Sequence, residues 1–370
     1  MVKETRFYMT PEYQIEVNEN HTDEHWDTFL KCTPGGHHVQ TSLWGDVKAT
    51  LGWRALRILV KESHHILAGS QLLLKSYPLI GSVAYISKGP LLAVFDDRLL
   101  DILLKEVLRI SRASHVQLLV VQPPNNDILI AGNLPSYQFA PSLLELAPWA
   151  SILVDLSPSV DSIFGRIKRQ TRQNIRRSAR EGIITREGTR EDIDRFYKLY
   201  RTTSQRQNFI PYPLEYFVRM WDIFTQRGEI SLIMAEFEGN PVSALLLIPF
   251  QDTVIAKILG WSGQHSSRRP NDAVFWASIQ WSKANGYRWF DFEGIDIETA
   301  RTVMSGSELL EEMKHSPDFI KLGYGGQVVL YPMAFERLPN PILRWSYKKV
   351  SPKIGDTSPI SRLLEFLRKR

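Results

Sequence analysis

The sequence predicts a mixed α/β fold built from two similar domains that follow one another along the chain. The chain has 370 residues, and 43% of its residues are apolar, which is enough for two hydrophobic cores. The same order of strands and helices can be read in both halves, and a linker with three prolines, residues 135–148, separates them. We therefore expect an N-terminal domain at residues 1–148, a C-terminal domain at 149–335 and a basic tail at 336–370.

The first half is predicted to contain a strand, two helices, three strands, a helix and a final strand. The last helix is the clearest element, because Leu99, Leu103, Val107 and Ile110 recur at helical spacing. In chain order the expected elements span residues 13–17, 23–30, 42–51, 55–60, 65–74, 82–89, 96–111 and 116–121.

The second half repeats this order, beginning with a strand at residues 151–156. Its last helix carries alanines and tryptophans on one stripe and ends before Gly286. A polar helix at 298–314, a strand broken by glycines at 316–334 and a short helix at 361–370 are expected after the repeat. The elements of the repeat span residues 151–156, 160–181, 190–203, 214–225, 230–238, 241–250, 253–263, 272–285 and 287–294.

Three strands in a meander, followed by a helix and another strand, form the layout of the N-acetyltransferase (GNAT) fold. A strand, a helix and a second strand in succession predict a right-handed crossover between parallel neighbours. Two tandem GNAT-like domains would leave a cleft between them, and binding sites commonly lie in such clefts.

Composition excludes several classes of protein. Cys32 is the only cysteine, which excludes an internal disulfide framework and a multi-thiolate metal site. The adjacent pairs His37-His38 and His64-His65 lack metal-ligand spacing, so we expect no metal. Neither a signal peptide nor a long apolar run is visible, which indicates a cytoplasmic protein that would meet the inner face of the membrane only peripherally.

Six motifs follow one another along nearly the whole chain. They are QTSLWGDVKATLGW (40–53), AYISKGPLL (84–92), IKRQTRQNIRRSAREGI (167–183), RTTSQRQNF (201–209), RPNDAVFWASIQWSKANGYRWFDFEGID (269–296) and FIKLGYGG (319–326). In this order they resemble the FemABX family of peptidoglycan-bridge aminoacyltransferases, and in particular its shorter members without the long helical hairpin. The resemblance implies aminoacyl-tRNA as donor and co-substrate, no other cofactor, and a lipid- or UDP-linked muropeptide as acceptor in cell-wall synthesis.

The implied reaction is aminolysis of an ester, in which negative charge develops on the tetrahedral intermediate and on the departing ribose oxygen. A fixed cation would stabilise both, and loss of one such donor typically costs about 10²–10³ in rate. Lys321 matches the lysine of the family's terminal motif, although Ile320 stands where an aromatic residue is usual. The alternative is a surface lysine beside a strand bulge.

Basic residues elsewhere match positions that the family uses to hold the acceptor's phosphates. Lys48 and Arg206 combine a point charge with a bidentate donor, which suits a pyrophosphate. Ordinary roles as a helix-surface lysine and an ion-paired arginine remain open. Tyr85, Lys88 and Gly325 are further candidates for substrate binding.

A basic run without acids begins at Arg166 and is predicted to be helical. Within it Lys168, Arg169, Arg172 and Arg176 are candidates to contact the tRNA acceptor stem or anionic lipid. A solvated helix with paired arginines is the alternative.

Asp291 and Glu293 share one face of the last predicted strand of the second domain. They are candidates to orient the attacking amine and take its proton, because an ammonium must lose a proton before it attacks. Alternatively one of them pairs with Arg288 or with a helix arginine. Many family members carry Asp-Pro where this chain has Gln122-Pro123, and an amide cannot act as a base there.

Two other functions remain open. An acyl-CoA or acyl-carrier N-acyltransferase of envelope or exopolysaccharide synthesis would need a glycine-rich phosphate loop, whereas residues 268–273 contain no glycine and Pro270 has no N–H. A non-catalytic scaffold that binds tRNA or membrane would be compatible with the departures at Gln122 and Ile320.

Overall fold

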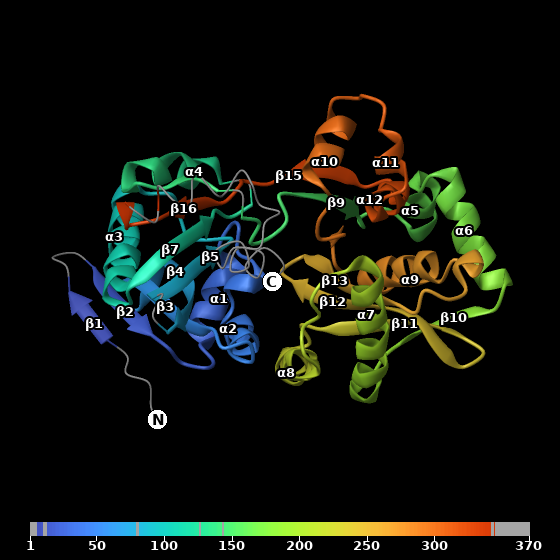
Figure 1. Ribbon diagram of the computed structural model, residues 1–370, viewed down its shortest axis with the longest axis horizontal. Helices are drawn as coiled ribbons and strands as arrows, with labels where there is room; N and C mark the ends of the chain where they lie inside the picture. The colour runs from blue at the N-terminus through green and yellow to red at the C-terminus, as the bar shows by residue number, and fades with distance from the viewer. Residues whose placement is uncertain are drawn as a thin grey trace. The chain divides into compact units, whose positions relative to one another are not determined.

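The computed structural model describes residues 6–9, 13–78, 81–125, 127–142, 144–341 and 344. The chain forms two compact units, the first from Met1–Ala147 with Tyr331–Arg370 and the second from Pro148–Leu330 (Figure 1). Residues 331–335, which we had assigned to the second domain, therefore belong to the first unit, because β16 (Phe335–Arg337) pairs with that unit's sheet. Most of the predicted basic tail, including the expected helix at 361–370, lies outside the described residues.

The first unit is a mixed sheet in the order β1-β2-β3-β4-β5-β7-β16-β8, with β6 paired to β4. Among these described strands, only β5 and β7 form a parallel pair. The chain segment that connects them contains helix α3 (Asp97–Ala113), as the sequence predicts. The remaining strands are β1 (Arg6–Met9), β2 (Gln14–Asn18), β3 (Arg54–Glu62), β4 (His65–Tyr77), β5 (Gly81–Ser87), β6 (Leu91–Leu92), β7 (Val116–Gln122) and β8 (Ala140–Pro141).

Helices pack against the sheet of the first unit. α3 (Asp97–Ala113) contacts β3, β4 and β7 through the leucine stripe that the sequence predicts, and α2 (Ser42–Ala49) also contacts β3 and β4. Gly45 permits the close approach of α2, because a Cβ there would lie 2.8 Å from the Ala55 Cβ. α1 (Glu24–Cys32) precedes α2, and α4 (Ile128–Asn133) follows β7.

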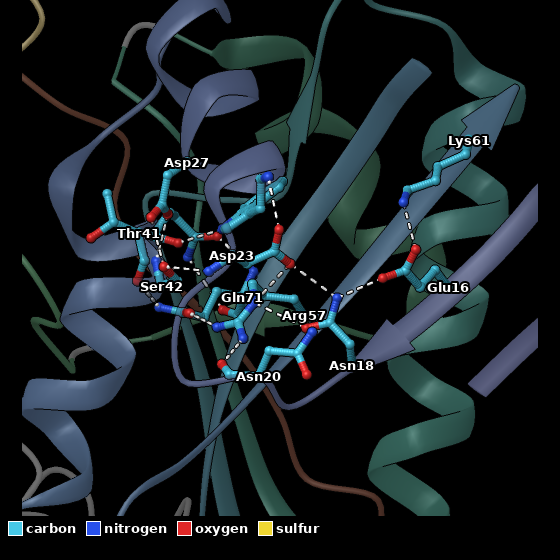
Figure 2. A network of polar contacts seen from close by, with 12 residues as sticks. Glu16, Asn18, Asn20, Asp23, Asp27, Thr41, Ser42, Arg57, Lys61 and Gln71 are labelled. Atoms are coloured by element: carbon cyan, nitrogen blue, oxygen red, sulfur yellow. Dashed lines mark hydrogen bonds and ion pairs between the residues drawn. The ribbon is translucent and has the colours of Figure 1, made fainter. Parts of the chain in front are cut away.

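A buried polar network fixes the α1–α2 region to β3 and β4 (Figure 2). Its centre is the fully buried guanidinium of Arg57, which lies 3.4 Å from Asp23 and donates to Gln71 at 3.0 Å. Asp27 accepts hydrogen bonds from the backbone N–H and the hydroxyl of Ser42, at the start of α2. The first turn of α2 is therefore held in place by buried side chains.

The second unit is a sheet in the order β10-β11-β12-β13-β14-β9-β15. Its β13 and β14 are the parallel pair, connected by α9 (Pro270–Ala284) as the sequence predicts. The strands are β9 (Ala150–Asp155), β10 (Ile183–Glu187), β11 (Ser231–Phe237), β12 (Asn240–Phe250), β13 (Thr253–Trp261), β14 (Trp289–Asp291) and β15 (Gln327–Leu330).

Two predictions for this sheet were wrong. We predicted that β9 would correspond to the first strand of the first half, but β9 lies between β14 and β15. The strand beside β11 at the edge of the sheet is β10. β10 was missed because the short segment IITRE is largely exposed and has no apolar alternation.

Helices cover the second sheet on both faces. α9 packs on β11 and β12, and the hydrophobic core between them includes Ile233 and Leu245. α7 (Ile193–Gln207) packs on β12 and β13. The predicted helix at 160–181 is divided into α5 (Val160–Arg166) and α6 (Arg169–Arg180), and α8 (Leu214–Phe224) follows α7.

The end of the second unit also differs from expectation. The predicted helix at 298–314 is two short helices, α10 (Ile297–Met304) and α11 (Glu311–Lys314), separated by a turn at Gly306 with positive φ. The segment predicted as a broken strand begins instead with α12 (Pro317–Lys321), for which Pro317 is a suitable first residue. Lys321 thus ends a helix and does not lie beside a strand bulge.

Candidate active site around Lys321

Lys321 lies at the end of α12 with its ammonium directed toward the segment that follows β14. Its Nζ donates a hydrogen bond of 2.5 Å to the carbonyl of Gly294, and this is its one hydrogen bond among the described residues. An ammonium has three donors, so two remain for a ligand. The side chain is partly buried, so its packing holds the charge in place.

Glu293 lies beside Lys321 and forms a buried ion pair with Lys257 of β13. The strand pattern predicted an extended Glu293, but β14 ends at Asp291 and Glu293 has a φ of 44°, in the left-handed region. A non-glycine residue in this region stores backbone strain of about 1–3 kcal/mol, and such residues are frequent at functional sites. The partner of Glu293 is Lys257, neither Arg288 nor a helix arginine.

Asp291 is buried at the end of β14 and orders the backbone next to it. It accepts a hydrogen bond from the Ser151 hydroxyl of β9 and another, of 2.7 Å, from the backbone N–H of Glu293. The Ser151 oxygen in turn accepts from the N–H of Gly294 at 3.1 Å. Asp291 and Ser151 therefore fix the turn that presents Glu293 and the Gly294 carbonyl to Lys321.

Burial changes the proton affinities of these groups. It lowers the pKa of Lys321, against the opposing attraction of Asp318, Glu293 and Asp291. It raises the pKa of Glu293, against the opposing attraction of the Lys257 and Lys321 ammonium groups. The site therefore contains an ammonium that loses its proton more readily, and a carboxyl that binds its proton more strongly, than the same groups do in water.

The glycine-rich loop after Lys321 packs against the start of the basic helix. The N–H of Lys168 donates to the Gly323 carbonyl at 2.8 Å, and the Lys168 ammonium lies 5.8 Å from the centre of the Phe319 ring. Gly325 has a φ of 72°, and a Cβ there would lie 2.4 Å from the carbonyl oxygen of Arg166. Gly325 thus has a local structural reason to be glycine, and its substrate contact stays a prediction.

The basic helix α6 exposes most of its charge. Arg172 is committed to the carbonyls of Gly165 and Ile167, and Arg176 stacks 5.2 Å from the centre of the Phe164 ring. Arg169 and Arg180 are exposed and have no hydrogen bond or ion pair within the described part of the chain. The alternative that α6 is a solvated helix with paired arginines therefore applies to only part of its surface.

The remaining substrate-binding candidates lie elsewhere in the two units. Lys48 is buried on α2 with its ammonium 5.3 Å from the centre of the Trp44 ring, and Lys88 is buried with its ammonium 4.5 Å from the centre of the Tyr331 ring. Tyr85 of β5 packs edge-on against Trp53, with the ring centres 4.8 Å apart. These three residues belong to the first unit, and their predicted roles in binding are untested.

Arg206 belongs to the second unit, at the end of α7. Its guanidinium lies 4.2 Å from the centre of the Trp261 ring, and the side chain is exposed. Partial burial lowers its pKa. Stacking on Trp261 and a hydrogen bond of 3.4 Å from its Nη1 to the Trp261 carbonyl orient the guanidinium. Its predicted phosphate contact remains a prediction.

Gln122 has a structural role that explains an amide at this position. It is fully buried; its Oε1 accepts from the N–H of Ala147 at 2.9 Å, and its Nε2 donates to the carbonyls of Ala147 and Pro332. Ala147 ends the first stretch of the first unit and Pro332 lies just after the chain returns to it. The Gln122 amide thus holds the chain both where it leaves the first unit and where it re-enters it. A carboxylate could not do this, because it has no N–H donors.

A small pocket in the first unit lies beside the Arg57 network. Its lining includes His21, whose Nδ1 lies 3.2 Å from a carboxylate oxygen of Asp46, and Trp53. None of the substrate-binding candidates in this unit lines it.

Sequence reasoning missed Lys257 and Ser151. Lys257 interrupts the apolar strand TVIAKILGW, and a charge within a buried strand is a signal that it has a partner. In the described part of the chain, no group of three or more His, Cys, Asp and Glu residues could hold a metal ion. No described helix is long and apolar enough to cross a membrane.

Comparison with known proteins agrees with this organisation. Residues 21–130 match the FemAB family, and residues 165–299 match an acetyltransferase (GNAT) domain. The lipid II:glycine glycyltransferase of Staphylococcus haemolyticus (strain JCSC1435) is 26% identical over 234 residues, which are 60% of this chain and 56% of that protein. The chain thus spans about half the length of the curated relatives it matches.

Two solved structures resemble the chain over most of its length. The crystal structure of FemX has a TM-score of 0.73 and 17% identity, covering 90% of this chain and 99% of FemX. A tandem GNAT protein from the clavulanic acid biosynthesis pathway has a TM-score of 0.53 and 10% identity, covering 88% of this chain and 99% of that chain. The predicted tandem GNAT-like fold is confirmed, and the FemAB family match lies within the first unit.

Proposed function

We propose that this protein transfers an aminoacyl group from aminoacyl-tRNA to an amine of a lipid-linked muropeptide in peptidoglycan synthesis. The relatives in staphylococci are named for glycine transfer to lipid II, which supports a lipid-linked muropeptide as the acceptor. The observation that carries the proposal is the Lys321 ammonium, fixed on the Gly294 carbonyl beside Glu293 with two N–H donors unused among the described residues.

The chemistry follows from these two groups. The acceptor amine attacks the carbonyl carbon of the aminoacyl ester, a C–N bond forms and the carbonyl oxygen becomes an anion. Lys321 stabilises this anion, and its collapse breaks the bond to the ribose oxygen. Glu293 accepts the proton that the attacking ammonium loses, since burial raises its pKa and makes it a stronger base than a solvated carboxylate. The nitrogen carries one more proton than the product amide after the C–N bond has formed, and this second proton passes to the departing ribose oxygen.

Helix α6 supplies a surface for the donor. Its exposed cations begin directly beside the loop that follows Lys321, because Lys168 and Gly323 are joined by a backbone hydrogen bond. A polyanionic RNA bound along α6 would bring its acylated end toward the same loop. Contact of α6 with anionic lipid remains the alternative use of this surface.

The donor is the most informative variable to test. The purified protein is incubated with lipid II and either labelled aminoacyl-tRNA or labelled acyl-CoA, and the muropeptide is analysed for the label. We expect label from aminoacyl-tRNA alone. Label from acyl-CoA alone would replace the proposal with an N-acyltransferase, and salt-sensitive tRNA binding without product would indicate a non-catalytic scaffold.

A further inference from the structure

The parallel strand pair of the second unit separates much earlier than that of the first unit. β13 and β14 are paired over three positions, from Thr253↔Trp289 to Ile255↔Asp291, whereas β5 and β7 are paired over six. Beyond Asp291 the chain stays with β9, because the N–H groups of Phe292 and Ile295 donate to carbonyls of that strand. After Ile255, β13 remains paired with β12 up to Trp261 but pairs with no further residue of β14.

Lys257 and Glu293 are joined across this point of separation. Each follows the last paired residue of its strand by two positions, and their side chains are 15% and 13% exposed. Burying two opposite charges is costly unless they are paired with good geometry, so the pair holds both side chains in fixed positions. An apolar pair would close the same gap without this cost, which points to a role for the charges.

The groups that face Glu293 come from three elements. Lys257 lies on β13, Asp291 ends β14, and Lys321 lies on α12, which also carries Asp318. The two lysines favour the ionised form of Glu293, whereas Asp291 and burial oppose it. Lys257 is the member of this set that forms a hydrogen bond with the Glu293 carboxylate.

We propose that Lys257 is a positioning residue for the transfer reaction, which holds Glu293 as a carboxylate in place beside Lys321. This inference rests on the proposed function, because it assigns Glu293 the task of accepting a proton. A base must be unprotonated and correctly placed when the amine attacks. Lys257 satisfies both requirements without contacting the reacting atoms.

Two variants separate this role from simple closure of the sheet. Lys257→Met keeps a long side chain but removes the cation, so Glu293 should hold its proton to higher pH. The acid limb of the pH profile of kcat/KM should then move up by roughly 1–3 pH units, the usual effect of losing an adjacent opposite charge. Lys257→Arg should restore the profile to nearly that of the unaltered protein.

Glu293 is also titrated directly, by the 13C chemical shift of its carboxyl carbon in protein labelled at glutamate, assigned with Glu293→Gln. Lys283→Met is the matched control, because Lys283 is a partly buried lysine of the same unit that donates to the Leu156 carbonyl at 2.8 Å. We expect the Glu293 midpoint to rise in Lys257→Met and to stay unchanged in Lys283→Met.

An unchanged Glu293 midpoint in Lys257→Met, or a loss of activity that is uniform over pH, would overturn the proposal. If the unaltered protein transfers nothing from aminoacyl-tRNA, the proposed function fails. The carboxyl titration still decides whether Lys257 controls Glu293, so the two failures are distinguishable.

Discussion

The backbone N–H of Lys168 donates a 2.8 Å hydrogen bond to the carbonyl of Gly323, so the basic helix α6 begins on the loop that follows Lys321. The contact is close on both sides, since a Cβ on Gly323 would lie 2.2 Å from the Thr171 hydroxyl oxygen. A ligand bound to the cations of α6 would therefore be positioned relative to the Lys321 loop by rigid packing within one unit.

Removing unpaired cations from α6 should weaken binding of tRNA. Arg169→Gln with Arg180→Gln removes two exposed guanidinium groups that have no hydrogen bond or ion pair in the described structure. If both contact phosphates, the slope of log K against log salt should become shallower by about 1 per residue. Fluorescence anisotropy with labelled tRNA at several salt concentrations measures this slope.

Arg195→Gln on α7 is the control for that experiment, because it removes another exposed arginine, whose partner is Asp192 of the adjacent turn. An identical slope in all three proteins would exclude α6 from the tRNA-binding surface.

Gly325→Ala should disturb the packing of the loop against the end of α5. The residue has a φ of 72° and an added Cβ would meet the Arg166 carbonyl, so both strain and a steric clash oppose the change. We expect a loss of at least 1 kcal/mol in the free energy of unfolding, measured by urea denaturation. Gly239→Ala, at a turn with a φ of 75° and nothing within 4 Å of the new Cβ, is the control and should cost less.

Asp272 should make stability depend on pH. Burial near the start of α9 raises its pKa to about 6 from the ordinary value of 3.8. The folded state then binds more protons than the unfolded state between these values, so the free energy of unfolding falls as pH rises from 4 to 7, by at most about 3 kcal/mol. Asp272→Asn removes this dependence and retains an oxygen that can accept from Asn174.

The measurement for Asp272 is urea denaturation of both proteins at pH 4.5 and pH 8. Relative to the unaltered protein, Asp272→Asn should be more stable at pH 8 than it is at pH 4.5. A difference between the two proteins that is the same at both pH values would show that the carboxyl is not buried in a way that affects its ionisation.

The buried Arg57 should contribute far more to stability than the neighbouring exposed Arg54. Arg57→Met leaves Asp23 without its buried counter-charge and removes the donor to Gln71, so we expect a loss of about 3–5 kcal/mol (Figure 2). Arg54→Met removes an ion pair of 3.6 Å to Glu19 at a side chain that is 47% exposed, and should cost less than about 1 kcal/mol. Equal losses in urea denaturation would contradict the structural role of the network.

Local sequence pattern predicted most elements, because strongly apolar strands and the α3 stripe carry clear periodicity. It failed where tertiary pairing decides. β10 is a strand because it pairs with β11, and the segment Pro317–Lys321 is helical although glycines follow it closely. The position of β9 beside β14 is likewise a matter of topology, which periodicity does not encode.

The candidate site was predicted in part. Lys321, Asp291 and Glu293 do lie together, but the sequence placed the two acids on one regular strand, whereas a left-handed turn at Glu293 directs its side chain. Lys257 and Ser151 were missed because they are distant in sequence and reach the site through strand pairing. The tRNA and muropeptide contacts remain predictions.

Transfer by Lys321→Met tests the central claim most directly, in a single-turnover assay with aminoacyl-tRNA and lipid II. Lys314→Met, on α11, is the control, because its ammonium is paired with Glu308 and Glu311. We expect Lys321→Met to lose about 10²–10³ in rate with unaltered tRNA affinity and folding, and Lys314→Met to retain full rate. Undiminished transfer by Lys321→Met would contradict the account.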